Sequence, residues 1–319
     1  MRRAKAWAMI ALVALWAVWA PGTARAVAGQ DAPEFTAAVE AWLQGREETA
    51  LESLSALAAQ GNAAAQILLA ILDVTPAYQG DFLSGLPRDR RIALMRAPGG
   101  LSGQSWMRVA AGDEPLAQAW LRLWDGDAPA EVVLDFARLK EVRASHFAAR
   151  QLHSREKRGF GAMADDPAFP PSLMPLAILD WQGDDPARAR GARGALPVGH
   201  PGGRMLGLPS PSPEALWLWA ESDPLAANLR QTLRGLCPAS DDPAQDLAAF
   251  LAQTGGFWAL AWIGPPSEAL VDPLRYAASP LAAQVARRLL RDRSATGGAA
   301  PGAGPLPASP CIAALLAEG

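Results

Sequence analysis

The spacing of apolar side chains predicts helices along much of the chain. From Glu47 to Ala59, Ala and Leu residues recur every three or four positions, which is the period of an amphipathic helix. A second apolar stripe runs from Ala65 to Leu72. Gly61 and Asn62 lie between the two stripes, and Gly suits a helix C-terminus whereas Asn suits an N-cap. This stretch therefore predicts two helices joined by a tight turn.

The same arrangement is found at four further places. Small residues precede a capping residue, and an Ala with a long side chain follows it. The predicted turns lie at Gly112-Asp113, near Ser145, at Ser222-Asp223 and at Ser279. One helix pair leaves an apolar face that a neighbour must cover, so the pairs are expected to stack. The predicted fold class is all-α, with stacked antiparallel helical hairpins and irregular Pro- and Gly-rich connections.

Two of these stretches resemble a known repeat family. Sel-one-type, tetratricopeptide-like repeats have an aromatic residue, then an Ala pair, then Gly-Asn or Gly-Asp, then Ala and Leu. The chain is similar to an exported bacterial member of that family. The resemblance implies a scaffold that binds other proteins; by itself it implies no catalysis, and no cofactor is expected. The residues that carry it are Trp106, Ala110, Ala111, Gly112, Asp113, Ala117 and Leu121, together with Ala58, Ala59, Gly61, Asn62, Ala65 and Leu69.

Composition divides the chain into five predicted segments. They are a signal peptide at 1–26, an N-terminal repeat block at 27–158, an irregular connection at 159–213, a C-terminal repeat block at 214–293, and a flexible linker with a helical tail at 294–319. The connection is assigned from its Gly, Asp and Pro content and from the lack of a stable apolar period over residues 183–213.

The first residues predict export. A basic start over residues 2–5 precedes the uncharged apolar run Ala6–Ala20, and small residues stand at Ala24 and Ala26. This is the layout of a secretory signal peptide cut before Val27. The rival is an uncleaved membrane anchor, which needs about 20 apolar residues and so a longer run than this one. We expect a periplasmic protein of a Gram-negative bacterium, without a membrane span after cleavage.

The charge balance argues against nucleic acid as a partner. The chain has 29 Lys and Arg residues against 32 Asp and Glu. Loss of the four basic residues in the leader leaves 25 against 32, a net charge of −7. Non-specific nucleic-acid binding needs a positive face that displaces counterions. The expected partner is another protein of the cell envelope.

The chain has two cysteines, Cys237 and Cys311. In an exported protein an even pair predicts one disulfide. Cys311 opens a short apolar tail after a Gly/Pro-rich linker, so the bond is expected to hold this tail to the domain. A redox pair is the alternative, but neither cysteine lies in a C-x-x-C motif.

The residues that most often carry chemistry predict no catalytic, cofactor or metal site. Asp-Asp-Pro occurs at 165–167, 184–186 and 241–243. Paired carboxylates bind divalent cations, but Asp followed by Pro is also the pattern of a helix N-cap, which we favour. His146 and His153 share one face of a predicted helix, yet a metal site normally needs three or four ligands.

The sequence is compatible with two alternatives to the scaffold. One is an enzyme that acts on envelope polymers through scattered carboxylates, and the other is a carrier of an apolar ligand. A deep acidic cleft with a desolvated Glu would favour the enzyme, and a closed cavity lined by Trp and Leu would favour the carrier. A shallow, continuous concave surface would favour the scaffold. Most Trp residues are expected in the core, because they occur as pairs at helical spacing.

Overall fold

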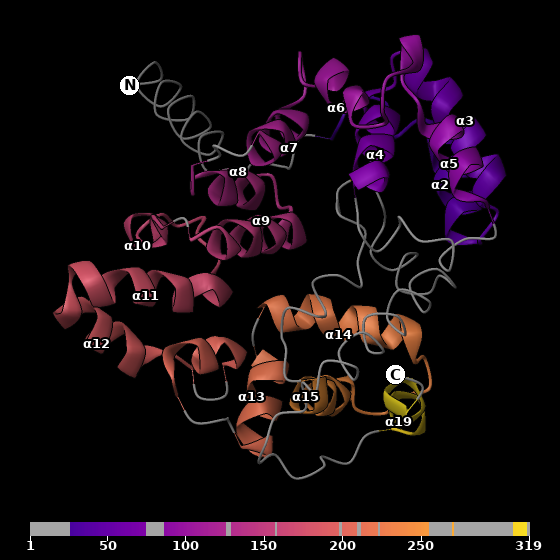
Figure 1. Cartoon of the computed structure of the whole chain (residues 1–319). Helices are drawn as coiled ribbons and strands as arrows, with labels where there is room; N and C mark the ends of the chain where they lie inside the picture. The colour runs from indigo at the N-terminus through magenta and orange to yellow at the C-terminus, as the bar shows by residue number, and fades with distance from the viewer. Residues whose placement is uncertain are drawn as a thin grey trace, which may run out of the picture.

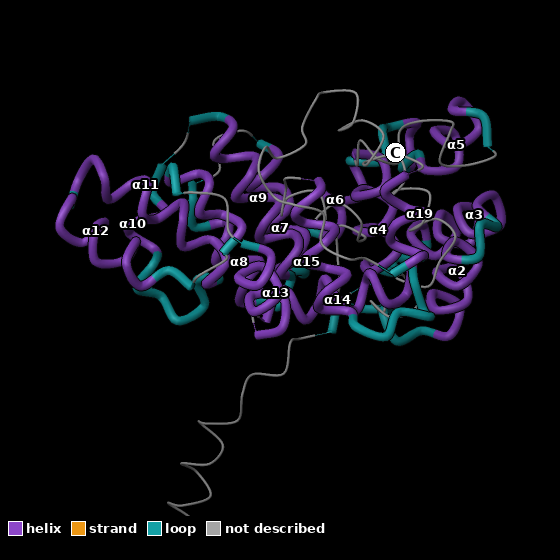
Figure 2. Tube along the Cα trace, turned by 90° about the horizontal axis from the view of Figure 1, so that it is seen from below, coloured by secondary structure: helices purple, strands orange, loops and turns teal. Residues whose placement is uncertain are grey.

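The computed structural model describes residues 26–74, 86–125, 129–156, 158–197, 200–208, 212–222, 224–254, 270 and 309–317. Within these residues there are 15 α-helices and no strands, which confirms the predicted all-α class (Figure 2). The helices are α2 (Pro33–Leu43), α3 (Glu47–Ala59), α4 (Ala63–Val74), α5 (Arg88–Met95), α6 (Ser105–Ala110), α7 (Pro115–Trp124), α8 (Val132–Arg138), α9 (Val142–Ser154), α10 (Phe160–Met163), α11 (Met174–Asp184), α12 (Pro186–Ala195), α13 (Pro213–Ser222), α14 (Pro224–Leu236), α15 (Pro243–Thr254) and α19 (Pro310–Ala317). Short 3-10 helices are η3 (Pro98–Gly100), η4 (Pro171–Leu173) and η5 (Pro201–Leu206).

Helices that are close in sequence pack against each other (Figure 1). In the N-terminal part, α2 packs on α3, α3 on α4, α4 on α6, α6 on α7, α7 on α8, and α8 on α9. Helix α11 packs against α10 and α12, whereas α13, α14 and α15 form a separate bundle that α19 joins through α15. In Figure 1 the helices follow an open curve from α2 at the upper right, past α10–α12 at the left, to α19 at the lower right.

Two clusters of buried apolar side chains form the core. The first extends from Val27 to Leu206 and includes Leu270, and the second extends from Leu216 to Phe250 and includes Ile312 of α19. Leu236 at the end of α14 packs against both clusters. The two groups of helices are therefore in contact through apolar side chains.

The described tryptophans lie mainly in this core, as the sequence predicts. Trp120 shows why: its ring packs against Phe136 and Phe147 with centroid distances of 5.0 and 5.7 Å, so a single side chain joins α7, α8 and α9. Trp258 and Trp262 lie outside the described residues. The buried tryptophans are Trp42, Trp106, Trp120, Trp181 and Trp219.

The segment 159–206 is largely helical, which corrects the expectation of an irregular connection. It forms α10, α11, α12 and η5, and it shares the first core cluster. The sequence did not predict helix α12, because this helix buries only Ala189 and so has no apolar stripe. The Asp185 side chain accepts the Arg188 N–H at 3.0 Å, and Pro186 occupies the first helical position. The Asp185 cap and the Ala and Arg residues, which have good helix propensity, form this helix without an apolar period, although it also contains Gly191 and Gly194.

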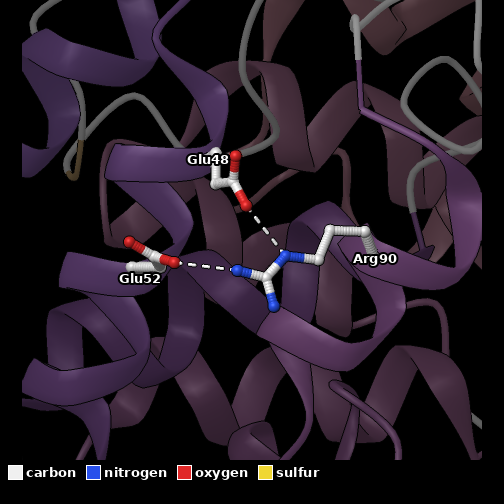
Figure 3. Close-up of polar contacts among 3 residues, drawn as sticks. All are labelled: Glu48, Glu52 and Arg90. Atoms are coloured by element: carbon white, nitrogen blue, oxygen red, sulfur yellow. Dashed lines mark hydrogen bonds and ion pairs between the residues drawn. The ribbon is translucent and has the colours of Figure 1, made fainter.

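An arginine joins α5 to α3. Arg90 donates from Nε to Glu48 at 2.8 Å and from Nη2 to Glu52 at 2.9 Å (Figure 3). About half of each side chain is exposed, so solvent screens the pairs and each contributes at most about 1 kcal/mol. The other face of α5 buries Arg91 and Met95.

Candidate functional site

The structure places Gly61 and Asn62 at the turn between α3 and α4. Gly61 has a φ of 90°, and its N–H donates to the Ala58 carbonyl at 3.0 Å. The Asn62 N–H donates to the Leu57 carbonyl at 3.0 Å, which completes a Schellman motif. The Asn62 Oδ1 then accepts the Ala65 N–H at 2.9 Å and caps α4. One dipeptide therefore ends the first helix and begins the second.

The same turn is present at two places that the sequence analysis did not mark. Gly45 (φ 78°) follows α2 and Lys140 (φ 61°) follows α8, and the same two backbone hydrogen bonds close both helices. The predicted turn near Ser145 is wrong, because Ser145 and His146 lie inside α9. The actual turn lies at Lys140, where no glycine signals it.

Gly112 and Asp113 lie between α6 and α7, but this turn is of another kind. The φ of Gly112 is not in the left-handed region. The N–H groups of Asp113 and Glu114 both donate to the Ala110 carbonyl, at 3.3 and 3.1 Å, and α7 begins with Pro115. Proline in the first turn supplies the φ that a helix needs.

The last two predicted turns are only partly described. Ser222 is the final residue of α13, and α14 begins at Pro224. Ser222 therefore lies at a helix boundary, as the repeat pattern requires. Asp223 and Ser279 lie outside the described residues.

Cys237 and Cys311 form the predicted pair. Their sulfur atoms are 2.02 Å apart and their Cα atoms 5.7 Å apart. Ile312, the next residue of α19, is fully buried in the second cluster. The Ser309 N–H donates to Asp246 Oδ1 of α15 at 2.9 Å. The tail is therefore held by a covalent bond, an apolar contact and a hydrogen bond.

The Asp-Asp-Pro tripeptides cap backbone N–H groups. Asp185 caps α12, and Asp242 accepts two N–H groups at the start of α15. The third copy starts no helix: Asp166 accepts the Ala168 N–H at 2.8 Å within a turn. That hydrogen bond lowers the pKa of Asp166, and the guanidinium of Arg138 lowers it further. The predicted capping role is thus observed twice at helices and once at a turn.

A groove of about 970 Å³ opens between the end of α9 and helices α10 and α11. Its apolar lining consists of Phe160 and Leu176, which are buried, and Leu179, which is partly exposed. Among the described helices, α9 packs closely on α8 but not on α10 or α11, and this leaves the space. The exposed lining is polar and of mixed charge, and consists of His153, Ser154, Glu156, Arg158, Gln182 and Gly183.

A glycine pair fixes α10 on α11 and so shapes one wall of the groove. Asp180 Oδ2 accepts the N–H groups of Gly159 and Gly161 at 2.8 and 3.1 Å. The Trp181 Nε1 donates to the Gly161 carbonyl at 3.0 Å. A Cβ on Gly161 would lie 2.8 Å from Trp181 Nε1, too close for any other residue without a shift. Asp180 lines the groove, but its buried oxygen already serves the backbone.

The two histidines that share a predicted helix face have different surroundings. His153 is exposed at the groove, whereas His146 is buried with its Nε2 2.7 Å from Ser172 Oγ. Burial lowers the pKa of His146 to about 3, and the nearby His200 contributes to the shift. Since His146 and Ser172 are 1% and 4% exposed, this pair joins α9 to η4 rather than meeting a ligand.

The groove residues of α11 were missed because the sequence analysis placed them in an irregular connection. The apolar run in α11 was an available signal, but it gives no information about the neighbouring end of α9. A smaller hollow of about 400 Å³ between α13, α14 and the start of α15 is charge-balanced, since Arg230 and Arg234 are matched by Glu221 and Asp242.

Further properties of the described residues limit the candidate chemistry. They contain no group of three or more His, Cys, Asp and Glu side chains that is placed to hold a metal ion. None of their helices has the length and apolar character that crossing a membrane requires. No family model, no curated protein and no solved structure matches the chain.

Proposed function

We propose that the protein is a periplasmic interaction scaffold of the cell envelope and that the groove between α9, α10 and α11 binds a peptide segment of a protein partner. The observation that carries this proposal is the lining of the groove: apolar side chains at its base and uncharged, basic and acidic groups at its edge. Protein interfaces combine an apolar centre with a polar rim in the same way. The predicted signal peptide supports the location.

The groove is large enough for a peptide segment as well as for a small metabolite, and its open shape favours the peptide. Its volume of about 970 Å³ is at the upper end of the range of about 300–1,000 Å³ for small-molecule sites. The groove is also open to solvent, whereas a carrier of an apolar ligand needs an enclosed cavity. Leu179 is the apolar lining residue that remains partly exposed, so it is the natural contact for an apolar side chain of the partner.

An enzyme receives less support from the same residues. Asp180 is the buried carboxylate of the groove, and it accepts two backbone N–H groups. An acid–base catalyst needs a carboxylate or imidazole that reaches the substrate, usually one that burial or neighbouring groups have tuned; His153 and Glu156 reach the groove edge, but both are exposed. The His146–Ser172 pair is buried away from solvent, and the lowered pKa of His146 makes the imidazole a weak base.

A site-specific photocrosslinking experiment tests the proposal. The full chain carries a photoreactive residue in place of Gln182 at the groove edge and is expressed with its own leader. We expect defined adducts with envelope proteins, identified by mass spectrometry, that are reduced at least tenfold by Leu179→Arg. The matched control is Leu101→Arg, because Leu101 is 57% exposed and is not part of the groove lining. Adducts that persist in Leu179→Arg, or that Leu101→Arg removes equally, would contradict the proposal.

A further inference from the structure

Residues 26–30, here called the N-terminal clasp, connect two turns that are distant in sequence. The Ala28 N–H donates to Glu114 Oε1 at 3.0 Å, and the Ala28 carbonyl accepts the Ala64 N–H at 3.1 Å. Ala64 lies in the first turn of α4, and Glu114 directly precedes α7. The clasp therefore joins the α3–α4 pair to the α6–α7 pair.

The clasp fits closely against the first of these turns. The Gly29 carbonyl accepts from Asn62 Nδ2 at 3.0 Å. A Cβ on Gly29, which has a φ of 82°, would lie 2.4 Å from the same Nδ2, so only glycine fits there. Val27 is 5% exposed and belongs to the first core cluster, and its N–H donates to Gln30 Oε1 at 3.2 Å.

Glu114 is a buried carboxylate without a cationic partner in the described part of the chain. The residue is only 4% exposed. Among the described residues, no Lys, Arg or His forms an ion pair with it. Burial of a carboxylate is costly unless positive charge or several N–H groups compensate it. One backbone N–H is a partial compensation, so a positive group near Ala28 would stabilise the fold.

We propose that an endopeptidase selective for small residues cuts between Ala26 and Val27, and that the new α-ammonium group of Val27 supplies the positive charge beside Glu114. Hydrolysis consumes one water: the Ala26 carbonyl carbon takes the hydroxyl, and the Val27 nitrogen takes the hydrogen and, near neutral pH, one further proton. The ammonium is formed one residue from the amide that already contacts Glu114. It still has an N–H for Gln30.

The order of events follows from the burial of Val27, the residue after the cut; Ala26 itself is exposed. Val27 is buried, and its carbonyl accepts the Gln30 N–H at 3.0 Å, so the folded clasp does not offer an extended substrate to a peptidase. Cleavage therefore precedes packing of the first helix pairs. This inference rests on the export part of the proposed function, and it adds that removal of the leader completes the joint between α4 and α7.

The test combines the identity of the N-terminus with a double-mutant cycle. The full chain is expressed with its own leader in a bacterial host, and intact mass is expected to show a chain that begins at Val27. One change is a single glycine inserted between Ala26 and Val27, which displaces the ammonium, and the other is Glu114→Gln. We expect the insertion to raise the unfolding equilibrium constant at least tenfold with Glu114 and less than threefold with Glu114→Gln.

A second readout separates the ion pair from a general loss of packing. The α-amine of Val27, followed by NMR in protein with labelled valine, should titrate above the ordinary range of about 7.7–8.0. In Glu114→Gln its pKa should return toward that range. An insertion that costs the same in both backgrounds, an unshifted α-amine, or a purified protein that retains the leader would overturn the inference. None of these results depends on photocrosslinked adducts at the groove. The proposed peptide-binding function can therefore fail while this inference holds, and the reverse.

Discussion

Several polar side chains of this protein donate to the backbone of the preceding helix. Gln66 of α4 donates to the Ala58 carbonyl of α3 at 2.9 Å, and Ser145 of α9 donates to the Val133 carbonyl of α8 at 2.9 Å. Both bonds are buried, where an unsatisfied side-chain amide or hydroxyl would be costly. These side chains therefore fix the position of one helix on the next, which apolar contacts alone leave free to slide.

His146 predicts a specific pH dependence of stability. Its pKa is about 3 in the folded protein and 6.5 in an unfolded chain. As the pH falls below 6.5, the unfolded chain binds a proton that folded His146 does not, so stability falls by up to about 1.4 kcal/mol per pH unit until the pH approaches 3. Urea unfolding at pH 7, 5.5 and 4.5 measures this slope.

The matched variant for this prediction is His146→Gln, which stays neutral and keeps a polar contact for Ser172. We expect the variant to be less stable at pH 7 and to lose less stability on acidification than the natural protein. Other groups contribute equally to both pH profiles, so the difference isolates His146. Parallel profiles would contradict the assignment.

At the scale of elements, helix ends explain how the chain reverses direction after α2, α3 and α8. Gly45, Gly61 and Lys140 adopt a left-handed φ directly after these helices. A residue with a side chain has a steric cost in that conformation, which glycine avoids. Gly112 lies at an equivalent place in the sequence pattern but has an ordinary φ. Gly61 and Gly112 thus have different roles, although the sequence pattern around them is the same.

The difference predicts opposite outcomes for two identical substitutions. Gly61→Ala should destabilise the protein by about 1–2 kcal/mol, because Ala adopts the left-handed conformation at a cost. Gly112→Ala should be neutral or slightly stabilising, because its Cβ would meet only the Val109 carbonyl at 3.9 Å. As a third variant, Lys140→Gly should stabilise by a few tenths to 1 kcal/mol. Thermal unfolding of the three variants measures these changes in stability. Equal losses of stability at positions 61 and 112 would refute the prediction.

At the scale of the whole molecule, two core clusters are held together by few elements. The ring of His200, which precedes η5, lies 6.1 Å from that of Trp219 in α13. Val142 at the start of α9 also packs against the second cluster. The tail helix α19 belongs to the second cluster, and the bond between Cys237 and Cys311 closes a loop of 74 residues.

Reduction of this disulfide should loosen the second cluster and leave the first unchanged. A bond that closes a loop of this length contributes about 4–5 kcal/mol on the chain-entropy model. Burial of Ile312, at about 1.5–3 kcal/mol, does not replace it. We expect amide hydrogen exchange in α19 and α15 to accelerate at least tenfold in reductant or in Cys311→Ser.

Exchange in α3 and α4 serves as the internal control for reduction, because these helices lie in the first cluster. Their protection should be the same in both redox states. If α19 exchanges at one rate with and without the bond, the buried contacts of the tail suffice and the disulfide is not its main anchor. If α3 and α4 also accelerate, the two clusters unfold as one unit.

The sequence by itself determined the features that depend on local rules. The apolar period from Glu47 to Ala59 matches α3, because one face of an amphipathic helix must be buried. Gly61-Asn62 marked a turn because glycine and an Asn cap act within a few residues. The pairing of Cys237 with Cys311 followed because a chain with two cysteines has one possible intramolecular disulfide. None of these inferences needs knowledge of distant contacts.

Only the tertiary structure decided the features that depend on distant neighbours. Helix α12 has no apolar stripe, so its own sequence did not predict that it packs beside α11. The turn at Lys140 lacks a glycine and is imposed by the packing of α8 on α9, which the helical pattern around Ser145 concealed. The groove exists because α9 and α11, two helices with ordinary sequences, do not pack closely on each other. The space depends on how α9 and α11 lie relative to each other, and the sequence of either helix alone does not specify that.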